Sequence, residues 1–261
     1  MIQILIPHYH EPNKVVKPLL DSLALQQNAD FGVIIVNDGS DVLLSDGLLK
    51  SYDFPVEYLR MEHGGLSAAR QYAVDHSTAD YVMWCDSDDM FLSCIGLYTI
   101  YQMMPFEMLV SNFAEETRVG DIPIYVNHPK DGTFVHGKVY NRKWLIDNQI
   151  RWDRELTIAE DSYFNSICLN VAKDIKYCET PFYLWKWRDG STIRSVTDFQ
   201  ILPDMLKSNS HLIRELLRRG MDEEADYYRE EMQRQLETMR SKPEWGTEQE
   251  TAYQEWREKW S

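Results

Sequence analysis

The 261-residue sequence lacks the features that mark membrane proteins and disulfide-rich secreted proteins. No apolar run approaches the roughly 20 residues that a membrane-spanning helix needs. The N-terminus has no basic region followed by an apolar stretch and a cleavage site. Cys85, Cys94, Cys168 and Cys178 show neither the paired spacing of a zinc site nor the density of a disulfide scaffold. We therefore expect a cytoplasmic globular protein with reduced thiols and without a transmembrane segment.

Positive charge is also scarce. The chain has 27 Lys and Arg against 42 Asp and Glu, a net charge of −15, and residues 221–261 hold 12 acids and 6 bases, which leaves −9 on the remainder. Nucleic-acid binding draws most of its affinity from neutralised phosphates, and anionic membranes attract basic segments. The charge balance disfavours both kinds of partner, and only a local basic patch would allow nucleic-acid binding.

The glycine-rich loops of common nucleotide-binding folds are missing as well. The first apolar strand is followed by Pro-His-Tyr-His-Glu-Pro at residues 7–12. A dinucleotide site would need Gly-x-Gly-x-x-Gly there, and a P-loop would need Gly-Lys-Ser/Thr. A sugar nucleotidyltransferase would also need a glycine-rich first loop to wrap a triphosphate. The sequence therefore excludes all three.

The sequence does contain apolar strands that alternate with helical patterns. Strands are predicted at 2–7, 31–36, 56–61 and 81–85, and helices at 13–27 and 66–76. This order predicts an α/β fold with a mostly parallel, doubly wound sheet. Ligands of such sheets lie beyond the carboxyl ends of the strands. Polar clusters follow three of these strands, at 7–11, 37–40 and 86–89.

The cluster after the fourth strand reads Asp-Ser-Asp-Asp at residues 86–89. Carboxylates at this spacing suit Mg²⁺ or Mn²⁺, which keep coordination positions open for water and substrate phosphates. A turn rich in Asp and Ser is the alternative, since these residues cap and turn chains for local reasons. The motif alone leaves both interpretations open. Its place on the same edge as the other two clusters favours a metal and a phosphate-bearing substrate.

Five segments together resemble the motifs of family-2 glycosyltransferases, which have the nucleotide-sugar-binding GT-A fold. They are Ile-Leu-Ile-Pro-His-Tyr-His-Glu (4–11), Val-Asn-Asp-Gly-Ser (36–40), His-Gly-Gly-Leu-Ser-Ala-Ala-Arg-Gln (63–71), Asp-Ser-Asp-Asp (86–89) and Glu-Asp (160–161). The resemblance covers about residues 1–195. The family usually has Asn where His10, His63 and Gln71 stand, which bears on donor selectivity more than on the reaction class.

The resemblance implies a site for a UDP-sugar. Asp38 would bind the uracil edge, Gly65 would let the backbone approach the nucleotide, and Arg70 would reach the diphosphate or the uracil side. The local alternatives are a turn-forming Asp38 and a solvated helix charge at Arg70. Further donor-binding residues implied by the family are Pro7, Tyr9, Glu11, Asp86 and Ser87.

The resemblance also implies the metal ligands and the catalytic base. Asp86 would contact ribose and metal, Asp88 of this DXD motif would ligate the metal directly, and Asp89 would support them. His136 would complete the metal shell, or it is a structural histidine. Asp161 would remove the proton from the acceptor hydroxyl; the alternative is an acidic first turn that complements a helix dipole.

Residues 181–195 alternate large and basic side chains up to a turn at Gly190. Alternation places Trp185 on one strand face and Arg188 on the other. Arg188 and Ser191 would close over the diphosphate. An edge strand whose basic side chains lie along its surface is an equal alternative.

The organisation changes to helices after residue 197. We therefore predict a GT-A catalytic domain at 1–197 and a C-terminal helical extension at 198–261. Tyr253, Trp256 and Trp260 share one helical face. This face would pack on the chain's own domain or, as alternatives, on a second copy in a homo-oligomer or on a membrane interface.

The sequence as a whole predicts a metal-dependent, inverting hexosyltransferase that uses Mn²⁺ or Mg²⁺. It would transfer sugar from a UDP-sugar to a hydroxyl of a glycan or cell-envelope polymer. One alternative is a glycosyltransferase acting on hydroxymethylated pyrimidine in DNA, which the acidic charge opposes. The other is a non-catalytic protein that binds a sugar nucleotide or a glycan, which intact Asp86, Asp88 and Asp161 oppose.

Overall fold

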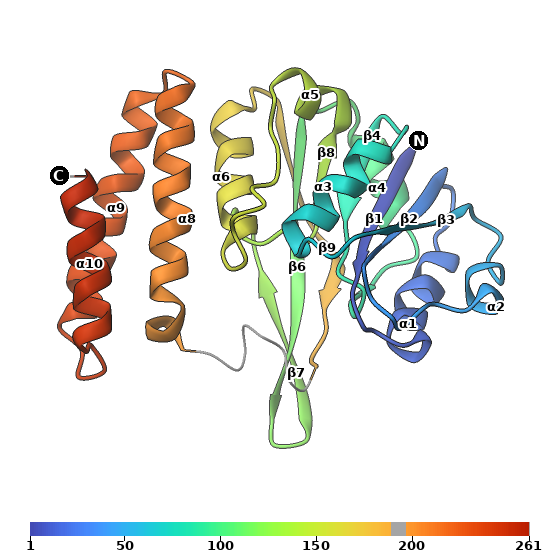
Figure 1. The fold of residues 1–261 in the computed structure, drawn as a ribbon. Helices are drawn as coiled ribbons and strands as arrows, with labels where there is room; N and C mark the ends of the chain where they lie inside the picture. Colours follow the sequence, from blue (N-terminus) through green and yellow to red (C-terminus); the bar gives the residue numbers. More distant parts are fainter. Residues whose placement is uncertain (189–196, 261) are drawn as a thin grey trace.

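The computed structural model describes residues 1–188 and 197–260. Within these residues, one mixed sheet of nine strands runs in the order β3-β2-β1-β4-β8-β6-β9-β5, with β7 paired to β6. Helices cover both faces of the sheet, and three C-terminal helices form a layer at one side (Figure 1). The strands are β1 Ile2–His8, β2 Phe31–Asp38, β3 Val56–Met61, β4 Tyr81–Trp84, β5 Met90–Phe91, β6 Met108–Val119, β7 Ile122–His128, β8 Lys138–Asn141 and β9 Ile175–Trp185.

The helices of the described residues fall into two groups. The helices of the sheet region are α1 Asn13–Ala24, α2 Asp46–Leu49, α3 Leu66–His76, α4 Gly96–Met103, α5 Arg142–Asp147 and α6 Glu160–Val171. The C-terminal layer consists of α8 Asp198–Arg218, α9 Asp222–Arg240 and α10 Thr247–Trp260. None of the described helices combines the length and the apolar character needed to cross a membrane.

The four N-terminal strands confirm the predicted parallel, doubly wound sheet. Strands β1 and β2 are parallel, as are β1 with β4 and β2 with β3. Alternate residues of β1 enter two different cores: Leu5 packs in the core shared with α3, α6 and α8, while Ile4 and Ile6 pack in the core shared with α1 and α4. Because both faces of β1, β2 and β4 are buried, these strands are mostly apolar, whereas the edge strand β3 is partly exposed.

The remaining strands make the sheet mixed rather than parallel. Strand β8 runs antiparallel to β4 and to β6, and β9 runs parallel to β6. The β6–β7 hairpin extends beyond the body of the molecule (Figure 1). These pairings bring residues 133–138 and the end of β9 to the edge at which β1 and β4 end.

The aromatic face of α10 packs on α8 of the same chain, as predicted. Tyr253 and Trp256 are buried there. The indole Nε1 of Trp256 donates to Asn209 Oδ1 at 3.2 Å, and that of Trp260 donates to Ser210 Oγ at 2.9 Å. This chain therefore covers the aromatic face of α10.

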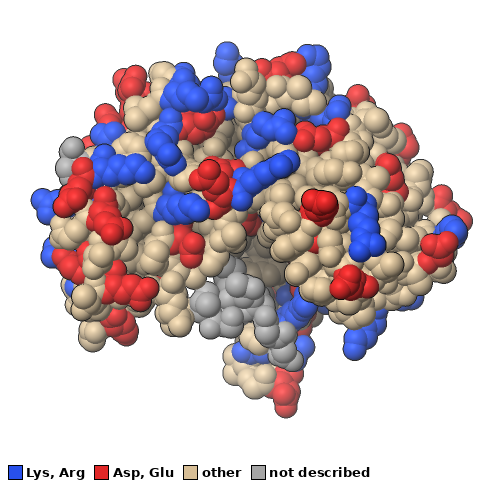
Figure 2. All heavy atoms as spheres, in the orientation of Figure 1, with Lys and Arg blue, Asp and Glu red and all other residues tan. Residues whose placement is uncertain are grey.

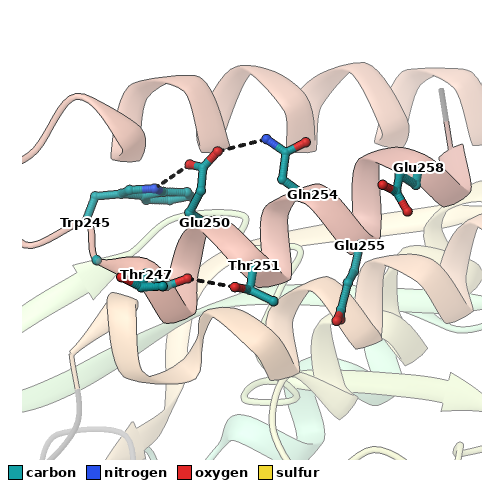
Figure 3. A pocket seen from close by; sticks show the side chains of 8 residues that line it. Trp245, Thr247, Glu250, Thr251, Gln254, Glu255 and Glu258 are labelled. Atoms are coloured by element: carbon teal, nitrogen blue, oxygen red, sulfur yellow. Dashed lines mark hydrogen bonds between the residues drawn. The ribbon is translucent and has the colours of Figure 1, made fainter.

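Helix α10 also borders a shallow acidic groove (Figure 3). Its most connected residue is Glu250, whose carboxylate accepts from Trp245 Nε1 at 2.9 Å, from the Arg240 guanidinium and from Gln254 Nε2. These hydrogen bonds connect α9 to α10. The carboxylate of Glu250 in this groove is thus already paired with Arg240, Trp245 and Gln254.

Candidate active site

A cavity of about 750 Å³ lies at the carboxyl ends of β1, β2 and β4, where the polar clusters were predicted to meet. The structure brings nearly all predicted site residues to its lining: Pro7, Tyr9, Glu11, Asp38, Gly65, Arg70, Asp86, Ser87, Asp88, His136, Asp161 and Arg188. Ser191 lies outside the described residues. Segments almost 200 residues apart in the chain thus line one cavity.

Asp38 ends β2 and holds the loop that leads into α3. Its Oδ1 accepts from Gly64 N at 2.8 Å and its Oδ2 from Gly65 N at 2.9 Å. The ring of His63 lies 2.9 Å from the same carboxylate. Gly65 has φ +85°, a conformation that favours glycine. The predicted turn role of Asp38 is therefore present, and its contact with a uracil ring stays a prediction.

Tyr9 and His63 form an aromatic wall beside Asp38. Their rings stack with centroids 4.5 Å apart and planes inclined by 21°. Tyr9 is 42% exposed, and its backbone N–H donates to Glu11 Oε2 at 2.8 Å. An exposed flat ring next to fixed polar groups is the kind of surface on which a nucleobase can stack.

Arg70 is buried, so the interpretation as a solvated helix charge is wrong. Its guanidinium donates to Glu160 Oε1 at 2.8 Å and to Asp86 Oδ1 at 3.0 Å, and it lies 4.7 Å from the centroid of the Trp152 ring. Burial disfavours the charge, but the neighbouring carboxylates outweigh that effect and raise the pKa of Arg70. Arg70 therefore links the motif after β4 to the start of α6.

Asp86, Asp89 and His136 form a cluster whose ligand atoms lie within 4.8 Å of one another. Asp89 is buried and accepts from Tyr183 Oη at 2.5 Å and from Lys186 N at 2.9 Å. Burial, and then the charges of Asp86 and Asp88, raise the pKa of Asp89 well above its ordinary value. Such a carboxyl group favours a neighbouring positive charge.

The imidazole of His136 fits a cation at this cluster. Its Nδ1 is buried without a hydrogen-bond partner, 3.8 Å from Asp89 Oδ2. Burial, and then the positive charges of Lys138 and Arg70, lower the pKa of His136 well below its ordinary value, so the ring is neutral. A neutral imidazole with an unpaired nitrogen beside carboxylate oxygens is a donor set that suits Mn²⁺.

Asp88 points to a different partner. Its Oδ2 lies 3.0 Å from Arg188 Nη1, which is also 3.2 Å from Glu11 Oε1. The structure therefore brings the predicted ligands Asp86 and His136 together with Asp89, while Asp88 lies at an ion pair beside them. The role of Asp88 as a direct ligand stays a prediction.

Asp161 lies in the first turn of α6 and lines the cavity. Its Oδ1 accepts from Ser162 N at 2.8 Å, which agrees with the local interpretation as an N-terminal helix acid. Burial, and then the negative charge of Glu160, raise the pKa of Asp161 to about 7, against the opposing effect of Arg70. A carboxyl group that titrates near neutral pH can accept a proton under ordinary conditions.

Sequence reasoning missed one wall of the cavity. Asp198, Ile201 and Met205 on α8 line it, together with residues 133–134 and 157–160. Ile201 and Met205 are four residues apart on one helix, a spacing that in sequence predicts only a packed face. No sequence signal distinguishes such a face from the wall of a site.

Known proteins share sequence with this chain. Residues 3–94 match the family described as Glycosyl transferase family 2. The chain is 25% identical to the glycosyltransferase GlyA of Streptococcus pneumoniae, over 76% of this chain and 32% of GlyA. It is 24% identical to an uncharacterized glycosyltransferase, EpsJ, of Bacillus subtilis, over 73% of this chain and 62% of EpsJ. The chain thus spans about a third of the length of GlyA and less than two thirds of the length of EpsJ.

Solved structures share the fold. TarS of S. aureus in complex with UDP-GlcNAc is similar with a TM-score of 0.66 and 21% identity, over 83% of this chain and 66% of that one. The mannosyltransferase PcManGT of Pyrobaculum calidifontis, in complex with GDP-Man and Mn²⁺, is similar with a TM-score of 0.57 and 14% identity, over 82% of this chain and 64% of that one. The predicted GT-A fold with C-terminal helices is confirmed.

Proposed function

We propose that this chain, a family-2 glycosyltransferase of the GT-A fold, transfers a sugar from a UDP-sugar to a hydroxyl of a glycan or cell-envelope polymer, with inversion at the anomeric carbon. The observation that carries the proposal is that one cavity holds both kinds of group that the reaction needs. Carboxylates suited to a metal-bound diphosphate line it, and so does Asp161, whose carboxyl pKa is raised to about 7.

The donor would lie along the edge formed by β1, β2 and β4. The uracil would bind at Asp38 against the ring of Tyr9, and the diphosphate would lie between the carboxylates after β4 and Arg188. Complexes of TarS with UDP and with UDP-GlcNAc support a UDP-sugar. PcManGT binds GDP-Man, so a test of the base should include guanine nucleotides.

A divalent cation would be held by Asp86 and His136 with Asp88 or Asp89. When bound, Mn²⁺ or Mg²⁺ neutralises charge on the leaving diphosphate. Arg188 would add a positive charge from the side of β9. Arg70 would keep Asp86 oriented, because its guanidinium fixes one oxygen of that carboxylate at 3.0 Å.

Asp161 would act as the general base on the acceptor side. It takes the hydroxyl proton while the acceptor oxygen forms a bond to the anomeric carbon and the bond from that carbon to the diphosphate oxygen breaks, so that UDP leaves. A single displacement from the opposite face inverts the configuration. Glu160 would not serve in this role, because its carboxylate is paired with Arg70.

An acceptor in the cell envelope is supported by the relatives. The chain is 32% identical to a teichoic acid poly(glycerol phosphate) polymerase of Staphylococcus epidermidis, over 34% of this chain, and 24% identical to the succinoglycan biosynthesis protein ExoW of Rhizobium meliloti, over 68%. On the face shown in Figure 2, the described basic and acidic side chains are interspersed rather than gathered in a basic stripe. Together with the net charge of −15, this opposes a DNA acceptor.

Release of UDP from a panel of UDP-sugars, with and without Mn²⁺, tests the proposal. We expect metal-stimulated release from one donor, and a further increase with the correct acceptor. GDP-mannose serves as the control for base selectivity. Binding of UDP without turnover of any donor, in the presence of candidate acceptors, would instead support the non-catalytic alternative.

A further inference from the structure

The turn that introduces Asp161 has an unfavourable backbone conformation. Ala159, the N-cap of α6, has φ +57° and ψ +25°, and no side chain caps this end of the helix. The left-handed region is disfavoured for a residue with a Cβ atom. Such a conformation persists only where surrounding contacts determine it, and it is frequent at functional sites.

Helix α8 supplies those contacts. Ser208 Oγ donates to the Ala159 carbonyl at 2.8 Å, and Ser208 is only 4% exposed. His211 Nδ1 lies 2.6 Å from Asp153 Oδ2, and Lys207 Nζ donates to the Glu155 carbonyl. Three neighbouring side chains of one helix thus hold the segment 153–159, which leads directly into Glu160 and Asp161.

The Ala159 carbonyl accepts hydrogen bonds both from α8 and from α6 itself. The donor in α6 is Tyr163 N at 3.1 Å, the first hydrogen bond of the helix. A carbonyl group that accepts two hydrogen bonds has a fixed direction. That direction fixes the orientation of the peptide group between Ala159 and Glu160, which directly precedes Asp161. Without the hydroxyl, a right-handed alternative becomes accessible to Ala159 and the first turn of α6 can reorient.

We propose that Ser208 is a positioning residue for Asp161. It holds the left-handed turn at Ala159 and thereby directs the Asp161 carboxylate into the cavity. This inference rests on the proposed function for the role of Asp161. It also assigns α8 a part in the reaction, in agreement with the position of Ile201 and Met205 in the cavity wall.

Ser210 offers a matched control on the same helix. It is buried like Ser208, but its Oγ accepts from Trp260 Nε1 on α10, whereas Ser208 Oγ donates to the Ala159 carbonyl. Ser208→Ala and Ser210→Ala each remove one buried hydrogen bond of α8. We expect a similar decrease in melting temperature for both. A difference between them in turnover or in loop order therefore reports on position rather than on stability.

The first measurement is steady-state release of UDP from the best UDP-sugar of the panel. Small misplacements of a reacting group cost up to about 10²-fold, so Ser208→Ala should lower kcat by roughly 10- to 10²-fold. KM for the donor and calorimetric affinity for UDP should stay within about twofold of wild type. Ser210→Ala should leave all three values within about twofold.

A second variant tests the turn itself. Glycine adopts positive φ without a steric penalty, so Ala159→Gly in the Ser208→Ala background should recover most of the lost kcat. The same change in the Ser210→Ala background measures the effect of the glycine alone, and it should raise kcat less than in the Ser208→Ala background. Absence of recovery, or an equal loss of kcat in the two serine variants, would overturn the proposal.

Hydrogen exchange separates this inference from the proposed function. The amides of residues 157–163 should exchange about tenfold faster in Ser208→Ala than in Ser210→Ala, whether or not a donor is turned over. If wild type releases no UDP from any donor, the proposed function fails. The hydrogen-exchange comparison would then still test whether Ser208 holds the turn at Ala159. Equal exchange in the two variants would show that Ser208 does not position this segment.

Discussion

The cavity has a donor wall, where the nucleotide-sugar is proposed to bind, and an acceptor wall, which holds Asp161. The two walls are built in different ways. On the donor side, Asp38 is fixed by two backbone amides of a nearby loop, within motifs that directly follow strands. On the acceptor side, the turn before Asp161 is fixed by a serine almost 50 residues further along the chain. The donor wall is therefore built mainly from motifs that directly follow strands, and the acceptor wall from the packing of α8 on the turn before Asp161. Substitutions at the donor wall should change donor affinity, and substitutions at the acceptor wall should change the rate of transfer.

The largest expected effect is on transfer and comes from Asp161→Asn. Loss of a general base lowers rates by about 10² to 10⁴, while UDP affinity should stay nearly unchanged because the proposed role of Asp161 is on the acceptor hydroxyl and not on the nucleotide. Asp38→Ala is the counterpart and should weaken UDP binding first. Calorimetry measures the UDP affinity of both variants, and a transfer assay measures their rates. Loss of UDP affinity in Asp161→Asn but not in Asp38→Ala would contradict the assignment of Asp38 to the donor site and of Asp161 to the acceptor site.

The next effect concerns the metal. If Asp88 leaves Arg188 to bind the cation, Asp88→Asn should abolish stimulation by Mn²⁺ and leave the melting temperature nearly unchanged, because Asp88 is part of a partly exposed ion pair. Asp89→Asn should instead lower the melting temperature, because Asp89 is buried and accepts from Tyr183. Titration with Mn²⁺ and thermal unfolding compare them. Unchanged Mn²⁺ dependence in Asp88→Asn would leave Asp86, Asp89 and His136 as the metal ligands.

A third effect tests the ion pairs by which Arg70 links Asp86 to Glu160. Arg70→Met removes the buried guanidinium that pairs with the buried Glu160 and with the partly exposed Asp86. Breaking such a pair typically costs about 3–5 kcal/mol of unfolding free energy. Denaturant unfolding measures this loss, with Arg151→Met, from an exposed pair, as the control that should change little. Equal stability of Arg70→Met and wild type would show that these ion pairs are not structural.

The smallest expected effect is on pH dependence. Since the pKa of Asp161 is raised to about 7, its base form is lost as pH falls through 7. Transfer should therefore fall about tenfold per pH unit below 7 and level off above it. For stability the sign is opposite: a raised carboxyl pKa favours the folded state at low pH, and this contribution is lost as pH rises through 7. Asp161→Asn should remove both dependences, and a rate profile that is flat between pH 5 and 8 would contradict the assignment.

The sequence predicted the donor wall better than the acceptor wall for a physical reason. Strands buried on both faces are mostly apolar, so β1, β2 and β4 and the polar residues after them were recognisable from local sequence. The burial of Arg70 was not, because its partners Asp86 and Glu160 come together only in the folded sheet. The division of the chain at residue 197 remains a prediction.

The cavity wall formed by α8 has a consequence for exchanging parts between relatives. A chimera joined at residue 197 would keep every recognisable donor motif and still replace Ile201, Met205 and Ser208. Under the proposed function, such a hybrid would keep the nucleotide preference of one parent, while the helix from the other parent would change the rate of transfer. Exchange of α8 is therefore a means of altering turnover without altering the residues proposed to bind the nucleotide.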